Sequence, residues 1–277
     1  MKIGIIGSGV MGKGVAQRFA MYNHDVFLYD NNQEVLSSAQ SEINKSLRIA
    51  SMFNKSINPE GIVSKIKVIT DYKELVDMDF IIENVTENSK TKETVYRNLE
   101  RACKVECIYL VNTSCIPITL IGSYTNRAEK VIGVHFMNPV PMKNFAEVIR
   151  GWETSEETIN ATKELLKSVG IEIEVVNDSA GFVSNRLSHL FMNEAASLVY
   201  ERVATPEQID NIFKKAFGHK MGPLETADLI GVDTVLDSLK VLYDHYEDSK
   251  YRACPLMKQM VYAGHTGRKV GKGFYNY

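Results

Sequence analysis

Short apolar runs alternate with amphipathic stretches along the first two thirds of the chain. The apolar runs are rich in β-branched residues and predict strands, whereas apolar residues that recur at three- and four-residue steps predict helices. This alternation favours a parallel sheet with helices on both faces. We expect strands at 2–6, 26–29, 66–70, 80–83, 108–111, 131–134, 146–149 and 171–176, and helices at 12–21, 33–53, 90–102 and 156–169.

The pattern changes after Gly181. Val183, Leu187, Leu190 and Ala195 recur at helical spacing, which predicts an amphipathic helix, and no strand is expected beyond it. We therefore expect an α/β domain over residues 1–178 and a smaller all-helical domain over residues 179–277. The later helices are separated by proline-containing breaks at Thr205-Pro206, Gly222-Pro223 and Cys254-Pro255.

The composition is that of an ordinary globular protein. Hydrophobic residues make up 44% and charged residues 24%, and the net charge is −2. This balance gives no basic field that would favour a nucleic acid or a membrane surface as a partner. No apolar run approaches the roughly 18 residues of a membrane-spanning helix, so we expect none.

The start of the chain and its cysteines indicate where the protein works. The N-terminus enters a strand-like run directly, without the features of a secretory signal. The four cysteines form no CxxC pair, so reduced thiols in the cytoplasm are expected. The six histidines show no HExxH-like spacing, and we expect no metal site.

A glycine motif follows the first expected strand. Gly7, Gly9 and Gly12 form G-x-G-x-x-G, with Met11 before the last glycine, and Asp30 ends the next strand 18 residues after Gly12. This arrangement is typical of a Rossmann-type dinucleotide-binding domain, in which the glycines approach the pyrophosphate and the acid bonds the ribose hydroxyls. A carboxylate at Asp30 would repel the 2′-phosphate of NADP, so NAD is favoured.

Polar residues collect where a reaction would take place. Ser114 and His135 follow two expected strands at the sheet edge that binds ligands in such folds. Glu147 lies in the next strand, close enough in sequence to fold back beside His135, and Asn185 begins the helical domain. Taken singly, each has a structural explanation as a helix cap, a core histidine or a solvated charge. Together they favour a catalytic site.

Ordered motifs over almost the whole chain make the sequence resemble the 3-hydroxyacyl-CoA dehydrogenase family, including its 3-hydroxybutyryl-CoA dehydrogenases. The glycine motif is the first of them. The others are Glu83-x-Val85-x-Glu87-Asn88, Asn112-Thr113-Ser114, His135-Phe136-x-Asn138-Pro139-x-Pro141, Gly181-Phe182-x-x-Asn185-Arg186, Gly222-Pro223-Leu224, Asp228-x-Ile230-Gly231-x-Asp233 and Gly267-Arg268-Lys269-x-Gly271-x-Gly273-Phe274-Tyr275.

The resemblance implies an NAD-dependent enzyme that interconverts a 3-hydroxyacyl thioester and its 3-keto form. It implies that His135 is the general base, that Glu147 orients and stabilises its imidazole, and that Ser114 and Asn185 bond the substrate oxygens. It also implies a homodimer formed through the helical domain. The cofactor contacts that it implies, together with those of the glycine motif, are Gly7, Gly9, Met11, Gly12, Asp30, Glu87, Lys92 and Asn138.

The sequence departs from many relatives in the helix expected at 33–53. Relatives carry a lysine-rich cluster there that contacts coenzyme A phosphates, whereas here only Lys45, Arg48 and Lys55 surround an apolar middle. Coenzyme A with these cations is the favoured carrier, and an acyl carrier protein, whose arm lacks the adenosine 3′-phosphate, is the alternative. Asn84 and Thr86 also depart, since relatives usually have small or branched apolar residues at both positions.

Two other functions compete with this interpretation. β-Hydroxyacid dehydrogenases share the domain arrangement, but they use a catalytic lysine a few residues before an asparagine on the interdomain helix, and residues 181–185 contain no lysine. A non-catalytic NAD-binding protein would be free to lose Ser114, His135, Glu147 or Asn185, and this chain retains all four.

Overall fold

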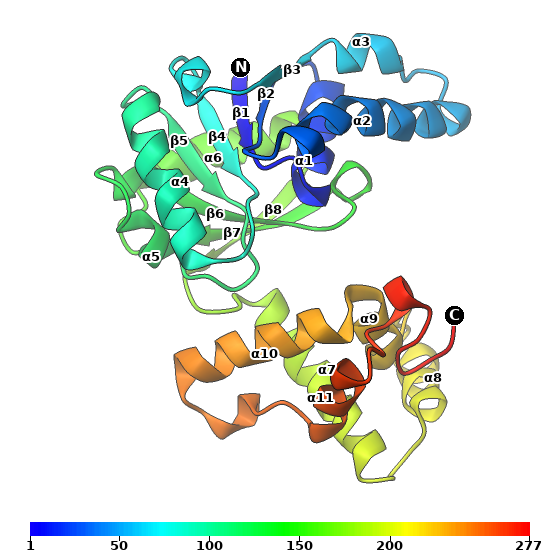
Figure 1. The fold of residues 1–277 in the computed structure, drawn as a ribbon. Coiled ribbons are helices and arrows are strands. Elements are labelled where there is room, and N and C mark those ends of the chain that lie inside the picture. The colour runs from blue at the N-terminus through cyan, green and yellow to red at the C-terminus, as the bar shows by residue number, and fades with distance from the viewer. The chain divides into compact units, whose positions relative to one another are not determined.

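The computed structural model describes all residues from 1 to 277 and divides the chain into two compact units, Met1–Asp178 and Ser179–Tyr277 (Figure 1). The first unit is built around one eight-stranded sheet. The second unit consists of helices and short turns. The α/β fold followed by a helical domain is therefore confirmed.

The sheet has the strand order β3-β2-β1-β4-β5-β6-β7-β8. Its first six positions are those of the Rossmann fold, in which the order reverses between β1 and β4. All eight expected strands are present, with ends that differ from the prediction by at most two residues. They are β1 Lys2–Ile6, β2 Asp25–Tyr29, β3 Ile66–Ile69, β4 Phe80–Glu83, β5 Ile108–Val111, β6 Val131–Phe136, β7 Phe145–Arg150 and β8 Glu172–Asn177.

One strand pairing departs from the parallel arrangement that the alternation of strands and helices favours. β6 and β7 are antiparallel, whereas every other neighbouring pair is parallel. The connection between them covers residues 137–144 and contains only the short 3₁₀ helix η3, Val140–Met142. A parallel connection needs a crossover of a dozen or more residues, so this link can only return the chain in the opposite direction.

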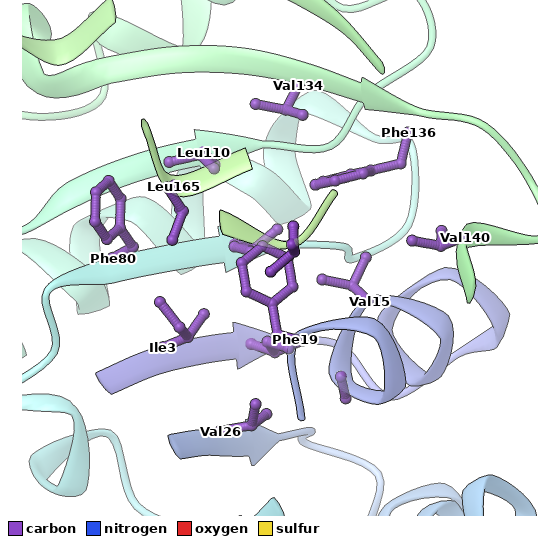
Figure 2. Packing of buried hydrophobic residues seen from close by; sticks show 14 of the residues in the cluster. Ile3, Val15, Phe19, Val26, Phe80, Leu110, Val134, Phe136, Val140 and Leu165 are labelled. Carbon is purple, nitrogen blue, oxygen red and sulfur yellow. The ribbon is translucent and has the colours of Figure 1, made fainter. Parts of the chain in front are cut away.

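Helices cover both faces of the sheet. On one face, Val15 and Phe19 of α1 and Leu165 of α6 pack with strand residues such as Ile3 and Leu110 (Figure 2). On the other face, a tyrosine of α4 packs edge to face against a tyrosine of β5. The helical elements of this unit are α1 Val10–Met21, α2 Gln33–Phe53, α3 Pro59–Val63, η1 Tyr72–Leu75, α4 Ser89–Ala102, α5 Ile118–Gly122, η2 Ala128–Lys130, η3 and α6 Glu156–Ser168.

Two buried aspartates organise the second unit. Asp228 accepts hydrogen bonds from the backbone N–H groups of Phe274 and Tyr275 at 2.9 and 3.0 Å, and a Cβ on Gly273 would lie 2.0 Å from its Oδ1. Asp210 has the same relation to Gly222 and the start of α9. These glycine motifs therefore serve packing around buried carboxylates. The helices are α7 Ser184–Tyr200, α8 Pro206–Ala216, α9 Pro223–Ile230, α10 Val232–Tyr246, η4 Ser249–Tyr251, α11 Pro255–Tyr262 and η5 Arg268–Val270.

Candidate active site

The glycine motif forms a tight turn between β1 and α1. Gly7 has φ +94°, and a Cβ there would lie 2.7 Å from the carbonyl oxygen of Asn84. A Cβ on Gly12 would lie 1.8 Å from the carbonyl oxygen of Gly7, whereas one on Gly9 would meet no atom within 4 Å. Gly7 and Gly12 are therefore required by the turn itself. Gly9 faces open space, which a ligand phosphate can approach.

A cavity of about 490 Å³ opens beside this turn. Asp30 stands in its wall and accepts hydrogen bonds from the backbone N–H and the Oγ of Ser8 at 2.6 and 2.9 Å. The wall contains one carboxylate and no cationic side chain, so these residues fit a dinucleotide without a 2′-phosphate. The lining residues are Ile6, Gly7, Gly9, Tyr29, Asp30, Asn31, Val35, Tyr72, Asn84, Val85, Thr86, Thr91, Thr94, Val95 and Asn98.

His135 and Glu147 lie opposite each other in the antiparallel pair β6–β7. Nδ1 of His135 is 3.5 Å from Oε2 of Glu147, and both side chains are largely buried. Directly opposite residues project from the same face of a sheet, so the register alone brings the imidazole and the carboxylate together. The pair can hold a histidine in one orientation and stabilise its cationic form.

Ser114 lies in the loop that follows β5, and Glu87 fixes the backbone of this loop. Oε1 of Glu87 accepts hydrogen bonds from the N–H groups of Ser114 and Cys115 at 2.9 and 3.0 Å. The hydroxyl of Thr113 donates to the same oxygen. Several charge-assisted bonds to one carboxylate hold the loop in a single conformation.

Lys92 lies beneath the surface and not in the cavity wall. Its side chain is fully buried, and Nζ contacts the two carboxylate oxygens of Glu83 at 2.8 and 2.7 Å and the carbonyl oxygen of Asn112 at 3.2 Å. Burial raises the pKa of Glu83, and the adjacent ammonium opposes that rise. An ammonium has three donors, and these contacts use them all. Sequence reasoning quoted Glu83 within a family motif but gave it no role, although an acid at a strand end nine residues before a lysine was visible.

The remaining candidates lie elsewhere. Asn138 is exposed in the link after β6, and Met11 is partly buried in the first turn of α1. Asn185 lies in the first turn of α7, in the second unit. The three cations around the apolar stretch, Lys45, Arg48 and Lys55, are all exposed on α2 or just beyond its end.

Two other kinds of feature are absent from the structure. No group of three or more histidine, cysteine, aspartate or glutamate side chains is placed to hold a metal ion. No helix is long and apolar enough to cross a membrane.

Comparison with known proteins covers the whole chain. Residues 2–179 match the model of the 3-hydroxyacyl-CoA dehydrogenase NAD binding domain, and residues 181–277 match that of the C-terminal domain. A probable 3-hydroxybutyryl-CoA dehydrogenase of Deinococcus radiodurans is 42% identical over the full length of both chains. The 3-hydroxybutyryl-CoA dehydrogenase of Clostridioides difficile is also 42% identical, over 100% of this chain and 99% of its own.

A solved structure agrees with these sequence relatives. The (S)-3-hydroxybutyryl-CoA dehydrogenase of Ralstonia eutropha superposes with a TM-score of 0.95 at 37% identity. The match covers 100% of this chain and 98% of that one.

Proposed function

Since the chain belongs to the 3-hydroxyacyl-CoA dehydrogenase family, we propose that it interconverts a 3-hydroxyacyl-CoA, such as 3-hydroxybutyryl-CoA, and the 3-ketoacyl-CoA with His135 and Glu147 as its general base. Its family makes it an NAD-dependent 3-hydroxyacyl-CoA oxidoreductase. The observation that carries the finer proposal is the placement of Glu147 directly opposite His135 on neighbouring strands, 3.5 Å apart.

The pair supplies the proton chemistry of this reaction. Because Nδ1 of His135 faces Glu147, Nε2 is the nitrogen that takes the proton of the 3-hydroxyl group. Glu147 stabilises the imidazolium that results. Bound NAD would supply the acceptor for the hydride that leaves C3 of the substrate. In the reverse direction the imidazolium returns its proton to the keto oxygen as a general acid.

Other side chains position the reactants. We assign Ser114 and Asn185 to hydrogen bonds with the substrate oxygens, which fix the reacting carbon. Because the ammonium of Lys92 is enclosed, we assign that residue to holding Glu83 and the strand end at Asn112 and not to a direct cofactor contact. The residues proposed to contact NAD are Gly7, Gly9, Met11, Gly12, Asp30, Glu87 and Asn138.

The carrier of the acyl group has two candidates. Coenzyme A is the first, because Lys45, Arg48 and Lys55 remain to meet its phosphates. The second is an acyl carrier protein, and the end of α2 favours it: Met52 and Phe53 are 79% and 89% exposed among these cations. Exposed apolar side chains beside positive charge suit an acidic protein surface.

We also propose that the enzyme is a cytoplasmic homodimer. All four cysteines are free and buried, which suits a reducing compartment. The second unit exposes apolar side chains at the end of α7, between α7 and α8, on α8 and directly after it, and a second copy would cover them. These are Tyr200, Val203, Ile212 and Phe217.

The test follows NADH absorbance with the purified protein and acetoacetyl groups presented separately on coenzyme A and on an acyl carrier protein. His135→Ala should abolish turnover, and His245→Ala, which removes an exposed histidine, serves as its matched control. Turnover of the coenzyme A ester that depends on His135 supports the first proposal. Turnover on the carrier protein alone selects the second. Stoichiometric NADH binding without turnover on either would indicate a non-catalytic protein.

A further inference from the structure

Two asparagines connect the wall of the cofactor cavity to the loop that carries Ser114. Asn84 lines the cavity, and its Oδ1 accepts a hydrogen bond of 2.8 Å from Nδ2 of Asn112. Nδ2 of Asn84 donates to the carbonyl oxygen of Ile82 at 3.0 Å, which fixes the orientation of the amide. Asn112 precedes Ser114 by two residues. A residue of the cavity wall is therefore bonded, through its side chain, to the loop expected to hold the substrate.

Asn112 joins the ends of three further elements. Its N–H donates to the carbonyl oxygen of Glu83 in β4 at 2.9 Å, and its own carbonyl oxygen accepts from Lys92 of α4 at 3.2 Å. Its Oδ1 lies 3.5 Å from the backbone nitrogen of Phe136, the residue that follows His135 in β6. Asn112 is almost completely buried, so these contacts are shielded from competition by water.

We propose that Asn84 and Asn112 are a positioning pair that fixes Ser114 and the strand end at His135 relative to the bound cofactor. The inference rests on the proposed function, because it assigns that relation to hydride transfer between NAD and the acyl thioester. An apolar side chain at position 84 could not accept the bond that Asn112 donates to Asn84.

Asn84→Ala tests this pair, because it removes the acceptor of the bond from Asn112 at a position that is only partly buried. Loss of one neutral, partly buried hydrogen bond should lower kcat roughly three- to tenfold. The Kd for NADH should change by less than about twofold, since the bond acts on the loop and not on the cofactor. Thr86→Ala is the matched comparison, because Thr86 stands in the same cavity wall but makes no side-chain bond to Asn112.

The experiment measures kcat and both KM values with acetoacetyl-CoA for Asn84→Ala, Asn112→Ala, the double variant and Thr86→Ala. If the side chains act through one another, the double variant will be no slower than Asn112→Ala alone. Hydrogen exchange of the peptide covering residues 112–118, measured with NAD bound, reports whether Asn84 orders this loop and does not depend on turnover. Exchange should be faster in Asn84→Ala than in the wild type or in Thr86→Ala.

Three results would contradict the assignment of Asn84 and Asn112 as a positioning pair. A raised KM for NADH with unchanged kcat in Asn84→Ala would make Asn84 a direct cofactor contact. Additive losses in the double variant would show that the two residues act separately. Unchanged exchange over residues 112–118 would show that the bond does not order the loop. Absence of wild-type turnover would instead refute the proposed function. The exchange measurement would still show whether Asn84 orders the loop through Asn112.

Discussion

His135 and Glu147 face each other across β6 and β7, with Nδ1 3.5 Å from Oε2. This relationship depends on the one antiparallel pairing in the sheet. Because the link between the strands is short, residues that are twelve positions apart in sequence become directly opposed. A parallel β7 would need a long crossover and would bring its residues into a different register. The exceptional strand direction is therefore the feature that builds the proposed base.

Glu147→Gln should test the role of the carboxylate while preserving its shape. Without the negative charge the imidazolium is less stable and its orientation less fixed, so kcat should fall by about 10²- to 10⁴-fold. NADH binding, measured by fluorescence, should stay within about twofold of the wild type. Glu174→Gln is the control, since Glu174 is exposed on β8 in register with Glu147. Equal kcat values for Glu147→Gln and the wild type would remove Glu147 from the mechanism.

The glycine motif should respond differently at its second and third glycines. Gly12→Ala would press a Cβ to 1.8 Å from the carbonyl oxygen of Gly7, so the turn must shift, and we expect a lower melting temperature with loss of NADH binding. Gly9→Ala meets no atom within 4 Å and should melt within a few degrees of the wild type. Its methyl group projects into the space for the pyrophosphate, so NADH affinity should fall at least tenfold. Unaltered affinity in Gly9→Ala would place the pyrophosphate elsewhere.

Lys92→Met should be strongly destabilising. It leaves the buried carboxylate of Glu83 without its partner, a change that typically costs about 3–5 kcal/mol in the free energy of unfolding. Adding Glu83→Gln to Lys92→Met removes the stranded charge and should recover part of that loss. Lys67→Met is the control, because the Lys67–Glu74 pair is exposed and should contribute less than about 1 kcal/mol. Urea unfolding of the four proteins would decide, and similar losses at both lysines would contradict the prediction.

Local pattern and motif spacing were sufficient to predict most of the fold. Each strand of the sheet is a short apolar run between turn signals, and α2 runs over the predicted residues 33–53. The hydrophobic pattern of a strand does not by itself predict which strand it pairs with or in which direction it runs. The prediction placed β7 correctly along the chain and expected Glu147 to fold back beside His135, but the overall strand–helix alternation did not distinguish this antiparallel pair from its parallel neighbours.

The site was predictable in its residue types and less so in its contacts. Ser114 and His135 could be singled out because they follow expected strands at one edge of the sheet, and Glu147 because it lies in the next strand. The burial of Lys92 could not be predicted, because a lysine in an amphipathic helix is usually solvated. Only the tertiary structure brings Glu83 to it. The bond between Asn84 and Asn112 likewise joins residues 28 positions apart. Such pairs become visible only when neighbouring strand ends are placed side by side.

His24 should make the stability of the protein depend on pH below neutrality. Its ring is almost completely buried, Nε2 contacts the hydroxyl of Ser168 at 3.0 Å, and Nδ1 has no hydrogen-bond partner. Burial, with a smaller contribution from the N-terminal ammonium, lowers the pKa of His24 below 6.5. Between the folded pKa and 6.5 the unfolded chain therefore binds more protons than the folded one.

The contribution of neutral His24 to the free energy of unfolding is complete above pH 6.5. It is lost as the pH falls towards the folded pKa, by at most about 1.4 kcal/mol per pH unit. The variant His24→Gln can keep a bond to Ser168 but does not titrate. In urea unfolding between pH 7.5 and 5.5, the wild type should therefore lose stability relative to this variant. His245→Gln, at an exposed position, provides the comparison. A constant difference between the wild type and His24→Gln over this range would show that burial does not keep His24 neutral.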